Sequence, residues 1–283
     1  MITILKSDKL IAKINHKGAE LISLKNDVEK EFIWNGNPEF WSKHSPILFP
    51  IVGTLKNNEY YFEGKKYSLN RHGFARDMDF ELIAKTDSTA VFSLVNNTNT
   101  LNVYPFEFEL LLNYELTDNS LIITFKVINK NLFSMPFSIG AHPAFALPEQ
   151  FENYSLDFEY SEKLIRFELE NDLLSNVTNS IPRNENNVAL HYDLFEKDAL
   201  VFKKIKSKKI TLLENEKPFL CIQFDDFPSL GIWTKPKAPF ICLEPWLGYA
   251  DTTANSGNIL EKEGIKIIEA NEKFKLEYSI TLL

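Results

Sequence analysis

Hydrophobic and polar residues alternate with a period of two along several stretches of the chain. The clearest cases are 106–110 (FEFEL), 121–127 (LIITFKV) and 274–280 (FKLEYSI). This period puts successive side chains on opposite faces of a strand, so each stretch predicts a β-strand with one buried face. Turn-forming residues separate apolar runs at 63–65 (EGK) and 117–120 (TDNS). The pattern therefore predicts consecutive strands joined by hairpins.

Long amphipathic helices are missing from this pattern. The segment 37–41 (NPEFW) is able to begin one helical turn, with Pro38 at its first position. Parallel α/β folds need helical crossovers between strands, and none of sufficient length is apparent. We expect an all-β fold, a large antiparallel β-sandwich with few short helices, in which residues 1–283 form a single domain. The polar segment 170–187 is expected to be its longest loop.

Composition supports a β-rich globular protein. The chain has 283 residues, of which 44% are hydrophobic and 13% aromatic, with 23 Phe and only 10 Gly. Large aromatic side chains favour the pleated surface of a sheet. A chain of this size buries enough surface to be stable without disulfides or structural metals.

Charge and cysteine content exclude several classes of protein. The 31 basic and 39 acidic residues give a net charge of -8, which repels nucleic acid and anionic membranes. Cys221 and Cys242 form no C-x-x-C motif, so we expect reduced thiols and no structural zinc. No apolar stretch approaches the roughly 18 residues of a spanning helix. We expect a cytoplasmic protein.

Glu244 follows the apolar run 239–243 (PFICL), which is typical of a strand covered on both faces. A carboxylate buried there without a partner has a raised pKa and suits general acid or base chemistry. Alternatively, Glu244 lies at the wet end of the strand, where Pro245 ends the ladder. Alternation puts Glu244 on the same face as Cys242 and Trp246.

His142 lies in a second unusual segment, 135–145 (MPFSIGAHPAF). A period of two puts its large apolar residues on one face and small residues beside His142 on the other, which leaves room for a ligand. An imidazole titrates near neutral pH, as a proton donor should. The alternative is a histidine that caps the turn before Pro143, which is the commoner use of a lone histidine.

The segment 70–77 (NRHGFARD) combines two arginines, a histidine and a glycine after a predicted hairpin. Gly73 allows the backbone to approach a ligand closely, and the fork of Arg71 suits paired hydroxyls or a carboxylate. The alternative is a solvated turn in which Arg76 pairs with Asp77 at the surface.

A fourth segment, 224–233 (FDDFPSLGIW), carries an acidic pair before a proline turn. Asp225 and Asp226 are best explained as turn formers. Trp233 is able to offer a flat face to a sugar ring, although core packing is the commoner use of tryptophan.

Three of these candidates, His72, His142 and Glu244, lie at the ends of predicted strands and are able to converge in one sandwich. No zinc motif, acidic metal loop, Walker loop, G-x-G-x-x-G or G-x-S-x-G accompanies them. One histidine with one glutamate fits concerted proton transfer, so we expect no metal and no cofactor.

Four motifs in one order carry a resemblance to a known family. They are 46–53 (PILFPIVG), 71–74 (RHGF), 140–145 (GAHPAF) and 243–246 (LEPW). At these residues the chain resembles the aldose 1-epimerase (mutarotase) family, in particular its bacterial branch associated with lactose and tagatose genes. The resemblance spans nearly the whole chain. It implies a galactose mutarotase-like supersandwich whose concave face holds a small sugar.

The resemblance also implies roles for single residues. Glu244 is expected to be the general base that removes the proton of the anomeric hydroxyl, and His142 the general acid that protonates the ring oxygen. Arg71 and His72 are expected to hold sugar hydroxyls and polarise the ring oxygen. Asp198 matches an acidic residue that binds substrate hydroxyls, although a turn residue at the start of a strand is nearly as good an explanation. Trp233 matches the substrate-side strand before the base.

Departures from the family pattern leave the substrate open. Galactose mutarotases carry His-Gly-Gly and Asn-His-Thr where this chain has Arg-His-Gly-Phe and Gly-Ala-His-Pro. The alternative is a hexose-6-phosphate mutarotase, with phosphate held by basic residues among Lys56, Arg71, Arg76 and Lys235. A non-catalytic sugar-binding sandwich is a further alternative. A glycoside hydrolase that pairs Glu244 with Asp198, Asp225 or Asp226 ranks last.

Overall fold

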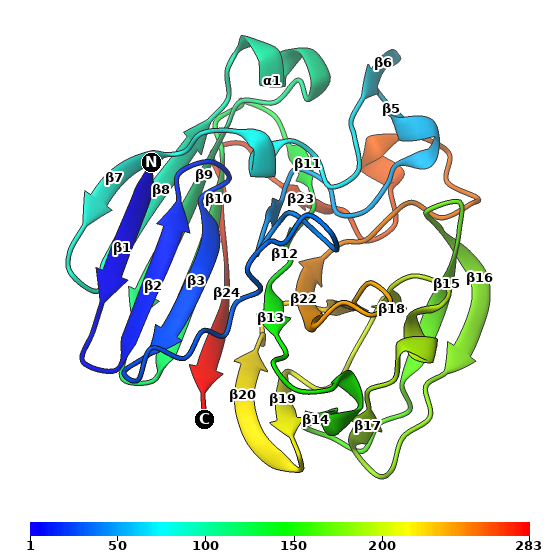
Figure 1. Ribbon diagram of the computed structural model, residues 1–283. Coiled ribbons are helices and arrows are strands. Elements are labelled where there is room, and N and C mark those ends of the chain that lie inside the picture. Colours follow the sequence, from blue (N-terminus) through cyan, green and yellow to red (C-terminus); the bar gives the residue numbers. More distant parts are fainter.

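The computed structural model describes residues 1–283, which form two large β-sheets and three small ones (Figure 1). The strand pairs of both large sheets are antiparallel. The all-β antiparallel fold predicted from the period-two pattern is therefore confirmed.

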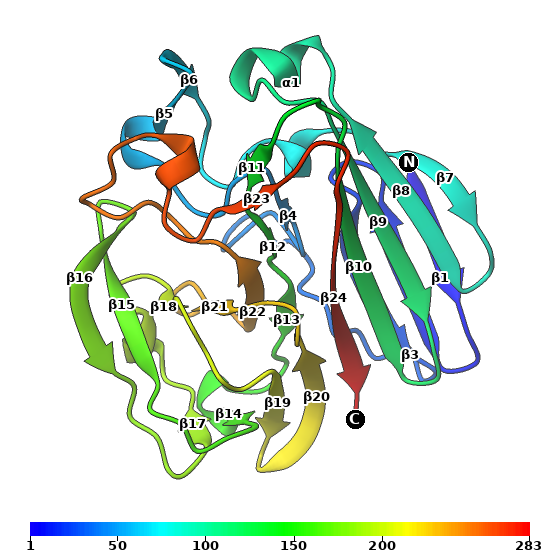
Figure 2. The same ribbon diagram turned by 180° about the vertical axis from the view of Figure 1, so that it is seen from behind.

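The larger sheet has nine strands in the order β17-β14-β19-β20-β24-β10-β9-β8-β7. In this order they span Asn187–Ala189, Tyr154–Phe158, Lys209–Glu214, Lys217–Gln223, Lys273–Leu282, Ser120–Asn129, Phe108–Leu116, Thr89–Val95 and Glu81–Lys85. β24, the last strand along the chain, lies between β20 and β10 and joins two groups of strands that come from different parts of the sequence (Figure 2).

The second sheet has eight strands, in the order β16-β15-β18-β21-β22-β12-β4, with β13 also paired to β22. They span Leu173–Ser180, Ile165–Glu170, Leu200–Phe202, Ser229–Trp233, Phe240–Leu247, Ile139–Ala141, Ile47–Leu48 and, for β13, Ala144–Ala146.

Smaller elements surround the two sheets. The small sheets pair β1 (Ile2–Lys6), β2 (Leu10–Asn15) and β3 (Glu20–Asn26), then β5 (Glu59–Phe62) with β6 (Lys65–Ser68), and β11 (Met135–Phe137) with β23 (Lys266–Ile268). The helices are α1 (Thr98–Val103) and the 3₁₀ turns η1 (Lys56–Asn58), η2 (Ala75–Asp77), η3 (Phe151–Asn153), η4 (Tyr192–Phe195) and η5 (Ile259–Glu261). None of them is long and apolar enough to cross a bilayer.

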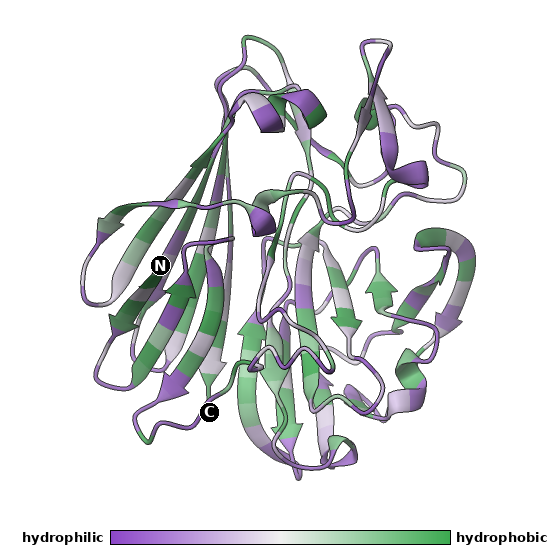
Figure 3. Cartoon of the chain, turned by 45° about the horizontal axis from the view of Figure 1, so that its top comes forward, coloured by the Kyte–Doolittle hydropathy of each residue, from purple (hydrophilic) through white to green (hydrophobic).

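Alternation along the strands builds the core as the sequence predicts. In β10, every second residue from Leu121 to Asn129 is buried, and β9 and β24 alternate in the same way over most of their length. The alternation of hydrophobic and hydrophilic residues is visible along the strands in Figure 3. The main cluster contains 67 buried residues, so it unites the strands into a common core.

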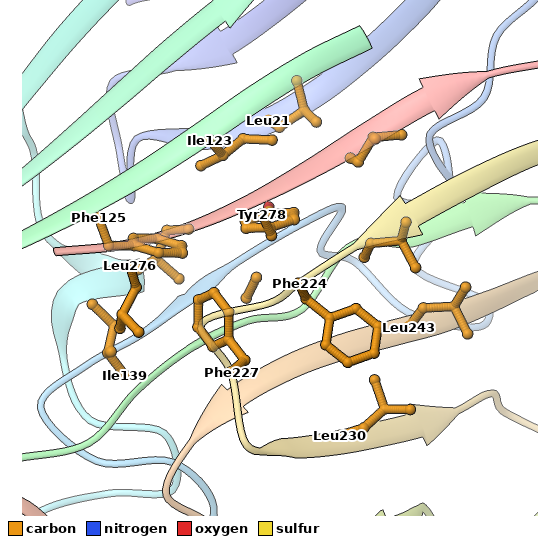
Figure 4. Packing of buried hydrophobic residues seen from close by; sticks show 14 of the residues in the cluster. Leu21, Ile123, Phe125, Ile139, Phe224, Phe227, Leu230, Leu243, Leu276 and Tyr278 are labelled. Atoms are coloured by element: carbon orange, nitrogen blue, oxygen red, sulfur yellow. The ribbon is translucent and has the colours of Figure 1, made fainter. Parts of the chain in front are cut away.

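Figure 4 shows part of this core between the two large sheets. Ile123, Phe125, Leu276 and Tyr278 of β10 and β24 lie on one side. Leu230 of β21 and Leu243 of β22 lie on the other side, and Phe224 and Phe227 lie between the two groups. Large apolar groups from both sheets therefore fix the distance between them.

The expected long loop at 170–187 is wrong. Residues 165–180 form the β15–β16 hairpin, with Leu169 opposite Leu174. Asn171 and Asp172 make its two-residue turn with φ of 52° and 65°, a conformation that Asn and Asp tolerate better than most residues. The polar composition of this segment led to the prediction of a loop. It arises because the residues of β16 after Ser175 are exposed.

Candidate active site

A cavity of about 370 Å³ lies against the eight-stranded sheet, on the face opposite the main core. Its volume is within the range of small-molecule sites. The lining residues are Trp41, Gly53, Arg71, His72, Arg76, His142, Leu169, Asp172, Leu174, Asp198, Ala199, Val201, Trp233, Glu244, Trp246 and Ala250. All six residues predicted as site residues are among them, so the structure brings together positions that are up to 173 residues apart, from Arg71 to Glu244.

Strand register places His142 opposite Glu244. Gly140 of β12 pairs with Trp246 of β22, and Ala144 of β13 pairs with Cys242. His142 lies midway between the two pairs, so it faces the residue midway between Trp246 and Cys242, which is Glu244. The Nε2 of His142 lies 3.2 Å from Oε2 of Glu244.

Glu244 is 1% exposed, so the wet strand end considered from sequence is wrong and the buried carboxylate is correct. Burial raises the pKa of Glu244 well above its usual value, partly opposed by the charge of Arg71. Burial also lowers the pKa of His142 to about 3, helped by Arg71 and Arg76. Near neutrality both shifts favour the uncharged forms, a protonated Glu244 and a neutral His142, which together hold one titratable proton.

Two N–H groups point at the imidazole of His72. The backbone N–H of Gly53 donates to Nδ1 at 3.1 Å, and Nε of Arg71 donates to Nε2 at 3.2 Å. Burial lowers the pKa of His72 well below its usual value, which favours the neutral imidazole. A neutral imidazole accepts at one nitrogen and carries its proton on the other, so only one of these two contacts is a hydrogen bond at a time.

Charged groups of both signs lie at the mouth of the cavity. Nη1 of Arg71 lies 3.0 Å from Oδ1 of Asp172, which no sequence pattern indicated, and Nη2 of Arg76 donates to the Arg71 carbonyl at 2.8 Å. Asp198 precedes β18 in a turn with φ of 75°. Asp198 and Glu244 line the same cavity, and the charge of Asp198 raises the pKa of Glu244.

Two tryptophans flank the imidazole of His142. Trp41 stacks on it with ring centroids 4.8 Å apart and an angle of 27°. Trp233 meets its edge at 5.9 Å and 80°. Sequence analysis identified Trp233 but missed Trp41, which follows the turn at residues 37–40; the turn is detectable from Pro38, but nothing in the pattern connects it with His142.

Two glycines make space for Trp246. A Cβ on Gly140 would lie 2.6 Å from Cδ1 of the indole, and one on Gly231 would lie 2.4 Å from Cζ2. Trp246 therefore rests on two strands that carry no side chain beneath it. Its Nε1 is buried on the cavity side next to Glu244, and the indole N–H lowers the pKa of Glu244 against the larger effect of burial.

Other charged candidates do not line the cavity. Lys56 donates to the Thr253 carbonyl at 2.9 Å, and Lys235 donates to the Phe40 carbonyl at 3.2 Å. Of the four basic residues considered for a phosphate, only Arg71 and Arg76 line the cavity.

Asp225 and Asp226 also lie outside the cavity lining. Asp225 accepts from the side chain of Gln223, and Asp226 accepts from the backbone N–H of Glu277. These contacts agree with their interpretation as turn residues.

The donor types around His142 include a thiol. One ligand atom each from His142, Cys242 and Glu244 lie within 4.8 Å of one another. These donor types resemble those of a zinc site. Without a metal ion, burial raises the pKa of the Cys242 thiol well above its usual value, so the thiol keeps its proton.

Fold and site together define an antiparallel β-sandwich that holds a buried His–Glu pair in a sugar-sized cavity. The family model for aldose 1-epimerase matches residues 1–280, and the chain belongs to this family of sugar isomerases. The protein LacX of Lactococcus lactis, encoded on a plasmid, is 35% identical over 295 residues, which cover 99% of this chain and 98% of that protein.

Two solved structures have the same fold. A galactose mutarotase related enzyme from Lactobacillus acidophilus is 36% identical, with a TM-score of 0.95 over 100% of this chain and 97% of that one. A galactose mutarotase-like protein from Lactobacillus casei is 33% identical, with a TM-score of 0.95 over 100% of both chains. The galactose mutarotase-like sandwich expected from the sequence is therefore confirmed.

Proposed function

We propose that this protein interconverts the α and β anomers of a hexose by opening and closing the sugar ring, with Glu244 as base and His142 as acid. The observation that carries the proposal is the 3.2 Å approach of His142 Nε2 to Glu244 Oε2 inside the cavity. Ring opening removes a proton from one oxygen of C1 and adds a proton to the other. Acid and base must then lie close together, as these two groups do.

The proton balance of the step is complete within the pair and the sugar. Before the reaction Glu244 carries the single proton of the pair, and its transfer to Nε2 of His142, 3.2 Å away, gives the carboxylate and imidazolium that react. The Glu244 carboxylate takes the proton of the C1 hydroxyl, C1=O forms, the bond from C1 to the ring oxygen breaks, and the ring oxygen takes the proton of His142. After rotation about the C1–C2 bond, Glu244 returns its proton to the aldehyde oxygen while His142 accepts the proton of the C5 hydroxyl. Either anomer is released, and the pair regains its starting state.

His72 and Arg71 support the same step. Both side chains line the cavity, where the guanidinium of Arg71 is able to donate to an oxygen of the sugar. Donors fixed in advance at the position of an oxygen stabilise charge that develops there, without a cost of reorganisation. Trp41 and Trp233 hold the imidazole plane on two sides.

The substrate class is a hexose. The two related structures are a galactose mutarotase related enzyme and a galactose mutarotase-like protein, and the cavity offers both acceptors and donors for hydroxyls, Asp198 and Arg71 among them. Hydroxyl recognition by fixed charged groups gives strong, directional hydrogen bonds.

Polarimetry on freshly dissolved α-glucose and α-galactose tests the proposal. The protein is expected to speed the approach to anomeric equilibrium, and Glu244→Gln or His142→Asn is expected to lower kcat by about 10² to 10⁴. Exposed Glu115→Gln and His191→Asn serve as matched controls with unchanged rates. A non-catalytic sugar-binding protein would leave the drift at the rate of the buffer alone.

Two results would contradict the assignment. Full activity of Glu244→Gln would show that Glu244 is not the base. Turnover of hexose 6-phosphates alone would show that free hexoses are not the substrate class.

A further inference from the structure

The tip of the β15–β16 hairpin forms one edge of the cavity. Leu169 and Leu174, which pair across the hairpin, line the cavity together with Asp172 of the connecting turn. The side chain of Asp172 is 53% exposed and Glu244 is 1% exposed. Asp172 is thus at the mouth and Glu244 at the floor.

Backbone hydrogen bonds hold this tip in place. The N–H of Leu174 donates to the carbonyl of Asp251 at 2.8 Å, and the N–H of Thr253 donates to the carbonyl of Leu174 at 3.0 Å. Asp251 is itself buried and paired with Lys262 at 3.0 Å. The turn that carries Asp172 is therefore anchored to a fixed segment beside the cavity.

The contact between Asp172 and Arg71 contributes little to stability. Both side chains are about half exposed, at 53% and 44%, and exposed ion pairs are typically worth 1 kcal/mol or less. The more important effect is on charge at the mouth. Two carboxylates, Asp172 and Asp198, offset the positive charges of Arg71 and Arg76 among the lining residues.

With C1 of a hexose at the buried pair, the far end of the ring points to the mouth. A hydroxyl there finds an acceptor in Asp172 and a donor in Arg71. A phosphate there would carry about two negative charges next to Asp172 and compete with it for Arg71.

We propose that Asp172 is a specificity-determining residue, which accepts a hydroxyl at the far end of a neutral hexose and disfavours a sugar with a phosphate at that end. This inference rests on the proposed function, since it takes C1 to lie at His142 and Glu244. It also explains why an anchored hairpin ends in an acidic residue over the cavity.

The test compares wild type, Asp172→Asn and the control Glu170→Gln. Glu170 belongs to the same hairpin and carries the same charge, but it does not line the cavity. Mutarotation rates are measured for glucose, galactose and their 6-phosphates. Wild type is expected to prefer the free hexoses.

Asp172→Asn is expected to raise KM for the free hexoses about threefold to tenfold, with a smaller fall in kcat, because Asp172 also holds Arg71, which supports the step at C1. For the 6-phosphates it raises kcat/KM about tenfold. Glu170→Gln changes neither value. In 0.5 M salt the preference of wild type for free hexoses becomes smaller, since half-exposed charges are screened.

A wild type that prefers 6-phosphates would overturn the inference, as would an unchanged preference in Asp172→Asn or an equal loss for both substrates. If wild type turns over no sugar, the proposed function fails. Calorimetric binding of glucose and glucose 6-phosphate to the same three proteins then decides the role of Asp172 separately, with the same expected change of preference.

Discussion

Substitution of Gly231 by alanine tests whether the packing of Trp246 limits the site. The added Cβ would lie 2.4 Å from Cζ2, 2.5 Å from Cη2 and 3.0 Å from Cε2 of the indole. Favourable carbon contacts begin near 3.5 Å, so the ring must move by about 1 Å. Its six-membered ring lies between β21 and the cavity. The ring must therefore either push the backbone of β21 away or move into the cavity, and both displacements cost free energy.

Overpacking of this kind costs about 1–3 kcal/mol. A chain of this size loses about 2–4 °C in Tm per kcal/mol, so Gly231→Ala is expected to lower Tm by about 2 to 12 °C. Because the indole is adjacent to Glu244 in the cavity lining, kcat/KM is expected to fall about tenfold to a hundredfold.

The assay is thermal unfolding together with polarimetry on four proteins: wild type, Gly231→Ala, Trp246→Phe and the double variant. Phenylalanine lacks the fused ring that meets the new Cβ, so the double variant is expected to show a favourable coupling of about 0.5–3 kcal/mol. Gly64→Ala is the control, because nothing lies within 4 Å of its Cβ and only its φ of +74° adds strain. Trp246→Phe is expected to restore none of the stability that Gly64→Ala loses.

Absence of coupling between positions 231 and 246, or a Gly231→Ala variant as stable as wild type, would refute the packing argument.

Three further predictions concern the surroundings of the site. Trp41→Leu removes the stacked ring from His142 and is expected to lower kcat about tenfold in polarimetry with folding intact; an unchanged kcat would contradict a positioning role. Because burial lowers the pKa of His142 to about 3 and raises that of Glu244, the second proton binds only in strong acid, so kcat/KM at pH 5 is expected within about twofold of its value at pH 7. A fall centred near pH 6.5 would show an ordinary histidine. Lys262→Met leaves buried Asp251 without its partner, so it is expected to lower the free energy of unfolding by about 3–5 kcal/mol, measured with denaturant. Adding Asp251→Asn is expected to restore part of this loss. If the two substitutions instead lower the free energy of unfolding by equal and additive amounts, the pairing is contradicted.

The fold followed from the sequence because its signal is local. In strands β9, β10 and β24 every second position is buried over most of the length, and the same alternation of apolar and polar residues is visible in the sequence. The hairpin β15–β16 was missed because most of its residues contact solvent, so no apolar period marks it.

The site was predictable only in part, for a physical reason. Glu244 and His142 interrupt patterns that packing would otherwise continue, and such interruptions are visible in a sequence. Asp172 and Trp41 occupy positions where Asp and Trp are ordinary, a turn and the end of a turn. Their importance comes from contacts with Arg71 and His142 across the fold.

The central place of β24 in the nine-stranded sheet has a consequence for biosynthesis. During synthesis the sheet strands among β7 to β10 are made first, and those among β14 to β20 are made next. β24, which lies between the two groups and pairs with both, is made last. Until then two half-sheets expose unpaired edges, which are prone to intermolecular association. Completion requires the pairing of β24 with β10, the longest-range pairing between two strands of the chain, so final folding is expected to follow synthesis and to be slow, on the order of milliseconds to seconds.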